Sequence, residues 1–272
     1  MRLTDLQGDA RPIAVARIGL GIATMMNAAE MFALLSQIAT GKLAMPVFPG
    51  APQPSMTAVY VYVVLAVSAG AAITVGWHAS RAAVVSTLLS LFVFFWDQQT
   101  YSSHRLLATL LVCYLIFASS DAKWSVSRWE RPVLWWPQLL MMTQLSVCYF
   151  FAAVSKMNGA FIYGGPLASW IWVPFPRWLF FLMAVGTIAV EIFLAFGFWF
   201  RPSRRLAVIL GLLLHGSIVL LMRDQTLPLI AFSLTCLSVY GLFAHCPVVF
   251  LGRTAKPSPA PLQTGEPQEG RP

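Results

Sequence analysis

The chain has 272 residues, of which 58% are apolar and only 10% are charged, and its mean hydropathy is +0.72. A soluble globular domain carries about 25% charged residues, because water must solvate its surface. The composition therefore excludes an ordinary cytosolic enzyme, an extended disordered chain and a disulfide-stapled secreted module. The net charge of +8 does not indicate a nucleic-acid partner, because the basic residues are scattered between apolar runs and form no stripe.

A helix needs about 20 apolar residues to cross the hydrocarbon core of a membrane, and about eight segments of that scale follow one another along the chain. In chain order they are residues 13–35, 56–77, 82–96, 104–120, 133–156, 178–200, 206–222 and 227–251. The third and fourth are short. The sequence predicts an all-α integral membrane protein in which one bundle of eight transmembrane helices, give or take one, occupies residues 13–251. Residues 1–12 precede the bundle, and we expect the polar tail, 252–272, to be disordered.

Lys and Arg favour cytoplasmic loops, so their distribution predicts the orientation of the bundle. With the N-terminus inside, twelve basic residues fall on the cytoplasmic side and five on the outer side, namely Lys42, Arg105, Lys156, Arg177 and Arg223. Arg17 lies just inside the first segment, and we expect it to snorkel to the cytoplasmic interface. The count favours both termini in the cytoplasm. We expect the plasma membrane, which is the inner membrane if the protein is bacterial, with the active side extracytoplasmic.

The cysteines predict apolar packing. Cys113, Cys148, Cys236 and Cys246 lie within or at the edge of apolar runs, with no CxxC pair and no histidine at metal-ligand spacing. We therefore predict no metal site.

An ionisable group inside hydrocarbon costs several kcal/mol unless it is paired or solvated, so such groups are the first functional candidates. Here they are Glu30, His104, Lys156, Glu191 and His215. Glu191 and His215 each lie about nine residues from the turn between two consecutive antiparallel segments, and hence at one depth. We expect them to hydrogen-bond, either as a structural clasp or as part of a proton relay or ligand site. Gly211 and Gly216 flank His215 and allow a close approach of the helices.

Lys156 ends the fifth segment on the predicted outer side, and it shares a helical face with Tyr149 and the small Ala152, which leaves room for a ligand. Such a lysine either snorkels to the headgroups or, when buried, presents a neutral amine that acts as a general base. His104 opens the fourth segment on the same side, as either an interfacial or a catalytic histidine. Together with Glu30, these groups are predicted to converge in the outer leaflet, which is typical of a functional site.

The segment between Lys156 and Arg177 has an unusual composition. Residues 157–166 hold three glycines and a proline, and Trp170 and Trp172 follow. This composition indicates either a re-entrant segment that roofs a lipid-accessible pocket or an aromatic anchor at the interface.

Several stretches resemble a known family. They are residues 103–107 and 121–127, Gln144, and the run from Tyr149 to Met157, which matches a Tyr-Phe-x-Ala-Gly-x-x-Lys-Leu pattern. The chain from Arg11 to Leu251 resembles the HTTM membrane domain of vitamin K-dependent gamma-glutamyl carboxylase and its bacterial relatives. Glu191 and residues 215–217 are similar in order and spacing. In the carboxylase, the lysine matching Lys156 deprotonates vitamin K hydroquinone, oxygen then adds, and the resulting strong base removes a proton from a glutamate side chain before CO₂ attacks.

The resemblance implies an outer-leaflet pocket for a quinol or a similar isoprenoid lipid, with Lys156 as the base and His104 as a second catalytic residue. Glu30, Tyr149, Glu191 and His215 are the expected pocket or relay residues. Ala153, Ser155 and Phe161 depart from the family's usual glycine, second lysine and tryptophan. The carboxylase's large lumenal portion has no counterpart here, so we expect a protein partner to supply any protein substrate.

Two functions therefore follow from the sequence. The first is a membrane enzyme with an oxidative or carboxylation-type lyase step that uses a quinone as its cofactor. The alternative is a non-catalytic membrane scaffold or lipid-binding partner of a redox protein. A channel or transporter is less favoured, because neither a ring of charges nor a pair of discontinuous helices is apparent.

Overall fold

The computed structural model describes residues 6–127, 133–223 and 226–244. Within these ranges the chain forms helices and three isolated β-bridges, without a strand. The helices are α1 (Ala10–Ala39), α2 (Met56–Val75), α3 (Ala79–Trp96), α4 (Ser103–Leu115), α5 (Trp135–Lys156), α6 (Gly159–Ile162), α7 (Gly165–Trp170), α8 (Arg177–Gly197), α9 (Arg201–Leu221) and α10 (Thr226–Tyr240), with 3-10 turns η2 (Gln98–Thr100), η3 (Ser120–Ala122) and η4 (Gly241–Ala244). The predicted all-α class is confirmed.

The described ranges contain 7 helices that are long and apolar enough to cross a membrane. They are α1, α2, α3, α5, α8, α9, and α10 with its continuation to Ala244. The fourth predicted segment contains α4, which has only 13 residues and rises about 20 Å, against about 30 Å of hydrocarbon. The membrane bundle is thus confirmed, while the number of crossings stays a prediction. Residues 245–251 of the last predicted segment, Cys246 and the tail 252–272 lie outside the described residues.

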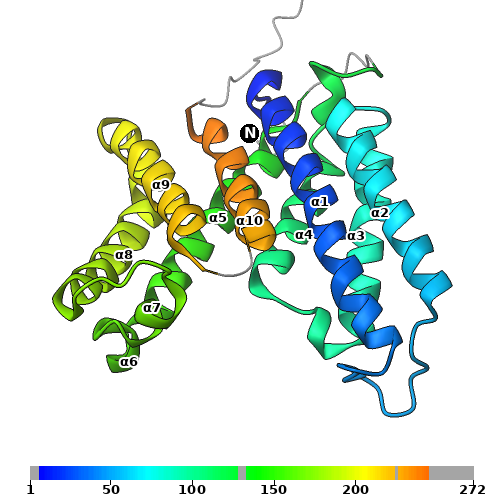
Figure 1. Ribbon diagram of the computed structural model, residues 1–272. Helices are drawn as coiled ribbons and strands as arrows, with labels where there is room; N and C mark the ends of the chain where they lie inside the picture. The colour runs from blue at the N-terminus through cyan, green and yellow to red at the C-terminus, as the bar shows by residue number, and fades with distance from the viewer. Residues whose placement is uncertain (1–5, 128–132, 224–225, 245–272) are drawn as a thin grey trace, which may run out of the picture.

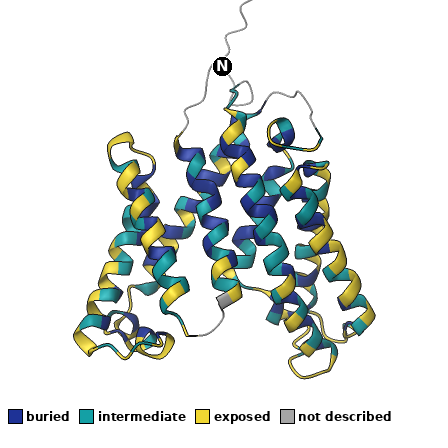
Figure 2. Cartoon of the chain, turned by 45° about the horizontal axis from the view of Figure 1, so that its top comes forward, coloured by how far each residue is buried: buried dark blue, intermediate teal, exposed yellow. Residues whose placement is uncertain are grey.

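Large apolar side chains cover much of the outer surface of the bundle. Val64 is 63% exposed, Leu88 61% and Leu220 73%, and Figure 2 shows exposed positions along the outer helices. Such a surface would be unstable in water but matches the hydrocarbon of a bilayer.

Figure 1 shows α1 to α4 on one side of the bundle and α8 and α9, with α6 and α7, on the other, while α5 and α10 lie between them. Helix α1 packs mainly against α2 and α10, and α5 packs mainly against α8. Glycines bring α1 and α2 together, since a Cβ on Gly70 would lie 3.0 Å from the Gly21 carbonyl oxygen. Small residues allow such close packing between membrane helices.

Arg17 connects α1 with the end of α2. Its side chain is fully buried, and its guanidinium donates to the Ile73 carbonyl at 3.2 Å and to the Trp124 carbonyl at 2.6 Å. The guanidinium thus reaches toward a connection between helices but is enclosed by protein, and its position relative to the membrane interface stays a prediction. The last carbonyls of a helix lack the usual partner four residues on; the Ile73 carbonyl accepts from the Gly76 N–H at 3.1 Å, and Arg17 reaches across from α1 as its second donor.

The connections gather at two ends of the bundle (Figure 1). One end, which we call the N-terminal end, is tied by the bridge between Gln7 and Leu134. At the other, which we call the Lys156 end, Pro46 pairs with Asp97 and Ile171 with Met222. The topology of the segments and the orientation of the two ends relative to the cytoplasm stay predictions.

Candidate functional site

Lys156 and Glu191 form an ion pair between α5 and α8, with Lys156 Nζ 2.6 Å from Glu191 Oε1. The Glu191 side chain is 7% exposed and the Lys156 side chain 26%. Lys156 Nζ also lies 3.4 Å from the Ala152 carbonyl oxygen, one turn earlier, so the lysine folds back along its own helix. The amine is held inside the bundle by a carboxylate and does not snorkel beyond the helix end.

The expected hydrogen bond between Glu191 and His215 is not formed. Glu191 Oε1 binds Lys156, His215 Nε2 lies 2.8 Å from the Tyr149 hydroxyl, and the remaining Glu191 Oε2 and His215 Nδ1 have no hydrogen-bond partner among the described residues. The predicted clasp is therefore wrong. Equal depth on neighbouring helices leaves the direction of each side chain around its helix undefined, and these two face different partners.

His215 belongs instead to a buried hydrogen-bonded cluster with Tyr149 and Tyr240. The Tyr149 hydroxyl lies 2.8 Å from His215 Nε2 and 2.6 Å from the Tyr240 hydroxyl. A Cβ on Gly211 would collide with the Tyr240 hydroxyl, whereas one on Gly216 would meet no atom within 4 Å. Gly211 thus permits a close approach of α9 to α10. The cluster links α5, α9 and α10.

His104 and Glu30 are neighbours at the Lys156 end. His104 Nε2 lies 3.6 Å from Glu30 Oε2 and 3.3 Å from Ser102 Oγ. Arg105 Nη2 donates to Glu30 Oε1 at 2.6 Å, and Nη1 donates to the Thr100 carbonyl. In the sequence alone, Arg105 contributes only to the predicted orientation. An intramembrane carboxylate needs a counter-charge, and that requirement is the signal that could have identified Arg105 as the partner of Glu30.

A cavity of about 670 Å³ brings His104, Lys156 and Glu191 to one space. Helices α4, α5 and α10 supply most of its wall, and α8, α9 and Met222 just after α9 supply the rest. Gln144, Cys148 and Ser155 add polar groups to a mainly apolar lining. Cys148, expected only to pack, therefore lines this cavity. Glu30, Tyr149 and His215 are not among the residues of its wall; they lie behind it, and the Phe232 ring on the wall packs against both histidine rings.

A second cavity, of about 80 Å³, lies on another side of the same ion pair, because Lys156 and Glu191 line both spaces. Phe161, Leu167, Trp170 and Ile171 from the segment after Lys156 supply part of its wall. This segment forms α6 and α7, which pack against α8, and Lys156 Nζ lies 5.9 Å from the centre of the Phe161 ring. The segment thus lies beside the ion pair at the smaller cavity, and the choice between a roof and an interfacial anchor stays a prediction.

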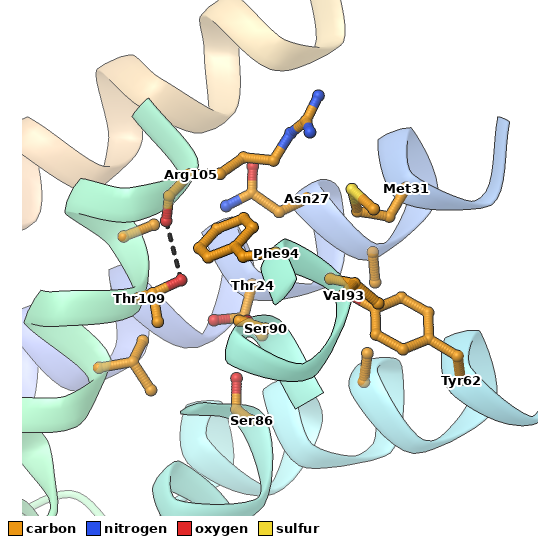
Figure 3. A pocket seen from close by; sticks show the side chains of 14 residues that line it. Thr24, Asn27, Met31, Tyr62, Ser86, Ser90, Val93, Phe94, Arg105 and Thr109 are labelled. Atoms are coloured by element: carbon orange, nitrogen blue, oxygen red, sulfur yellow. Dashed lines mark hydrogen bonds between the residues drawn. The ribbon is translucent and has the colours of Figure 1, made fainter. Parts of the chain in front are cut away.

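A third pocket lies between α1, α2, α3 and α4 (Figure 3). Its wall includes Arg105, the partner of Glu30, together with Asn27 and several hydroxyl groups. No cluster of three or more His, Cys, Asp or Glu that could hold a metal ion occurs in residues 6–127, 133–223 and 226–244.

Fold and site together define an all-α integral membrane protein that holds an ion pair and a histidine around a cavity within its helices. The HTTM domain matches residues 7–246. The chain therefore belongs to the HTTM domain family and is a membrane protein of the carboxylase-like type. No match to it is found among curated proteins or among solved structures.

Proposed function

We propose that the larger cavity binds a quinol or a similar isoprenoid lipid, and that Lys156 acts there as a general base in an oxidative or carboxylation-type step. The observation that carries this proposal is the ion pair of Lys156 with Glu191 on the wall of a 670 Å³ cavity that His104 also lines. Cavities of about 300–1,000 Å³ with apolar walls and a few convergent polar groups are typical ligand sites.

The residues present fit such a ligand. Leu106, Leu110, Val147 and Phe151 offer an apolar wall for an isoprenoid tail. Gln144, His104 and Lys156 supply the hydrogen-bonding groups that ring hydroxyls require. A bound quinol would be oxidised to the quinone, and its two electrons and two protons would pass to an oxidant such as molecular oxygen.

The ion pair can accept a proton. Lys156 Nζ lies 2.6 Å from Glu191 Oε1, so the carboxylate is within hydrogen-bonding reach of the proton that Lys156 must release before it presents a free amine. That amine can then accept a proton from an acidic hydroxyl in the cavity. Glu191 is a positioning residue, because it holds the amine inside the bundle.

Binding is tested with vitamin K hydroquinone and the purified full chain, by native mass spectrometry and lipid extraction. Ser155→Trp places an indole in the larger cavity, and we expect it to abolish binding. Ser169→Trp is the matched control, because Ser169 is exposed on α7 and lines neither cavity. Equal binding by both variants, or no binding by the wild type, would contradict the proposed ligand site.

The role of Lys156 is tested separately. Lys156→Arg retains the positive charge, but arginine does not release its proton, so we expect it to abolish quinol consumption while it preserves binding. The non-catalytic alternative is supported by the same ion pair, which also ties α5 to α8, and it predicts that Lys156→Arg behaves as the wild type in cells. Unchanged quinol consumption by Lys156→Arg would exclude Lys156 as the base.

A further inference from the structure

The pocket between α1, α2, α3 and α4 shares no lining residue with the two cavities around Lys156. In Figure 3 the Asn27 amide and the Arg105 guanidinium lie at one end, and the hydroxyls of Ser86 and Ser90 lie toward the other. Such a concentration of polar side chains is unusual inside a membrane bundle, where each polar group must find a partner. The pocket therefore has a chemistry of its own.

Two residues that line the pocket each carry a buried polar atom without a partner. Asn27 Oδ1 is an acceptor and Arg105 Nε is a donor, and neither has a hydrogen bond to any of the described residues. An unsatisfied buried polar atom costs about 1–3 kcal/mol, so a ligand that offers both a donor and an acceptor is strongly favoured here. Water offers both.

The size of the pocket selects the same ligand. Its volume is about 30 Å³, and one water needs about 10–15 Å³ by this measure, which leaves space for about two waters and excludes an organic molecule. An anion is not required, because Glu30 already neutralises Arg105 at 2.6 Å. Ser86, Ser90 and Thr109 supply the further hydrogen-bonding groups that an internal water needs.

We propose that this pocket is an internal water site whose water bridges Asn27 and Arg105. The water completes the hydrogen bonds of the Arg105 guanidinium, which holds Glu30, and Glu30 faces His104 at 3.6 Å. Arg105 is thus a positioning residue that extends a polar network from the wall of the larger cavity into the interior of the bundle. The site does not depend on quinol binding.

The experiment is radiolytic hydroxyl-radical labelling of the full chain in H₂¹⁸O, read residue by residue by mass spectrometry. Two buried methionines form a matched pair, since Met31 is 2% exposed and lines the pocket, whereas Met141 is 0% exposed and does not. We expect ¹⁸O incorporation at Met31 and none at Met141. Failure of Met31 to label above Met141 would show a dry pocket and overturn the proposal.

Variants connect this water to His104. Asn27→Leu removes the acceptor, and we expect it to abolish labelling of Met31 and to change the ratio of His104 tautomers in ¹⁵N spectra. Ala29→Leu, two residues further along α1 at an exposed position outside the pocket, should change neither. Ser90→Ala is the milder variant if Asn27→Leu does not fold. An unchanged tautomer ratio after loss of the label would overturn the positioning role.

Discussion

Lys156 and Glu191 matter at the scale of single residues because each leaves a buried charge when the other is removed. Lys156→Ala and Glu191→Ala should each lower the free energy of unfolding in detergent by about 2 kcal/mol, less than a fully buried pair because Lys156 is partly exposed. The double variant should lose clearly less than the sum. Thermal or denaturant unfolding of the four proteins measures this coupling.

The pair of Glu191→Ala with His215→Ala is the control for that measurement. Since no hydrogen bond joins these residues, their effects should add. Strong coupling between Glu191 and His215, and none between Glu191 and Lys156, would contradict the partners described above.

Gly211 and Gly216 provide a second test at this scale. Gly211→Ala forces its new methyl group against the Tyr240 hydroxyl, whereas Gly216→Ala meets open space. We expect Gly211→Ala to destabilise the protein by about 1–3 kcal/mol, as overpacking does, and Gly216→Ala to leave the melting temperature unchanged or slightly higher, because alanine favours a helix. Equal melting temperatures of the two variants would argue against close packing of α9 on α10.

The sequence identified the ionisable residues of the candidate site but not their pairing. Apolar runs marked Glu191 and Lys156 as costly groups inside hydrocarbon, and helical rise gave the depth of Glu191. The sequence places Lys156 at the outer end of its segment, but its side chain folds back toward Ala152. Glu191 lies roughly 20 Å along α8 from Arg177, the first residue of that helix. The relative heights of the helix ends and the rotation of each helix about its axis are set by packing. Neither leaves a simple periodic signal in the sequence.

At the scale of elements, Arg17 connects α1 with the end of α2. Arg17→Met keeps a long side chain but leaves the Ile73 and Trp124 carbonyls without the guanidinium, and hydrogen bonds to charged groups contribute about 1.5–3 kcal/mol each. We expect a loss of about 3 kcal/mol in unfolding free energy. Arg81→Met, at an exposed position near the same end, is the control and should have little effect.

The elements themselves were largely predictable, because the length of an apolar run determines whether a helix can cross. The run over residues 104–120 was recognisably short, and α4 ends at Leu115. The segment from Met157 to Pro176 was ambiguous, since its glycines and tryptophans suit both a roof and an anchor. Its two short helices are fixed by tertiary packing, in which Phe161 and Leu167 join Phe180 and Ala184 of α8 in one apolar cluster.

At the scale of the whole molecule, the orientation in the membrane is open to direct measurement. In a chain whose native cysteines are replaced by alanine, we introduce Gln53→Cys at the Lys156 end or Lys123→Cys at the N-terminal end, both at exposed positions. The excess of Lys and Arg near the N-terminal end predicts that an impermeant maleimide labels only the Gln53→Cys variant in intact cells. Labelling of the Lys123→Cys variant alone would reverse the predicted orientation and place the ion pair nearer the cytoplasm.

Helix α4 contributes to the wall of the larger cavity and to the polar pocket. With 13 residues it falls about 10 Å short of the hydrocarbon thickness, so a crossing by α4 would require the bilayer to thin beside it or to bring headgroups and water down to its ends. Such hydrophobic mismatch would draw the aqueous boundary toward His104. Protons would then reach the larger cavity by a shorter route than its position in the bundle suggests. Short-chain lipids would relieve the mismatch, and long-chain lipids would increase it.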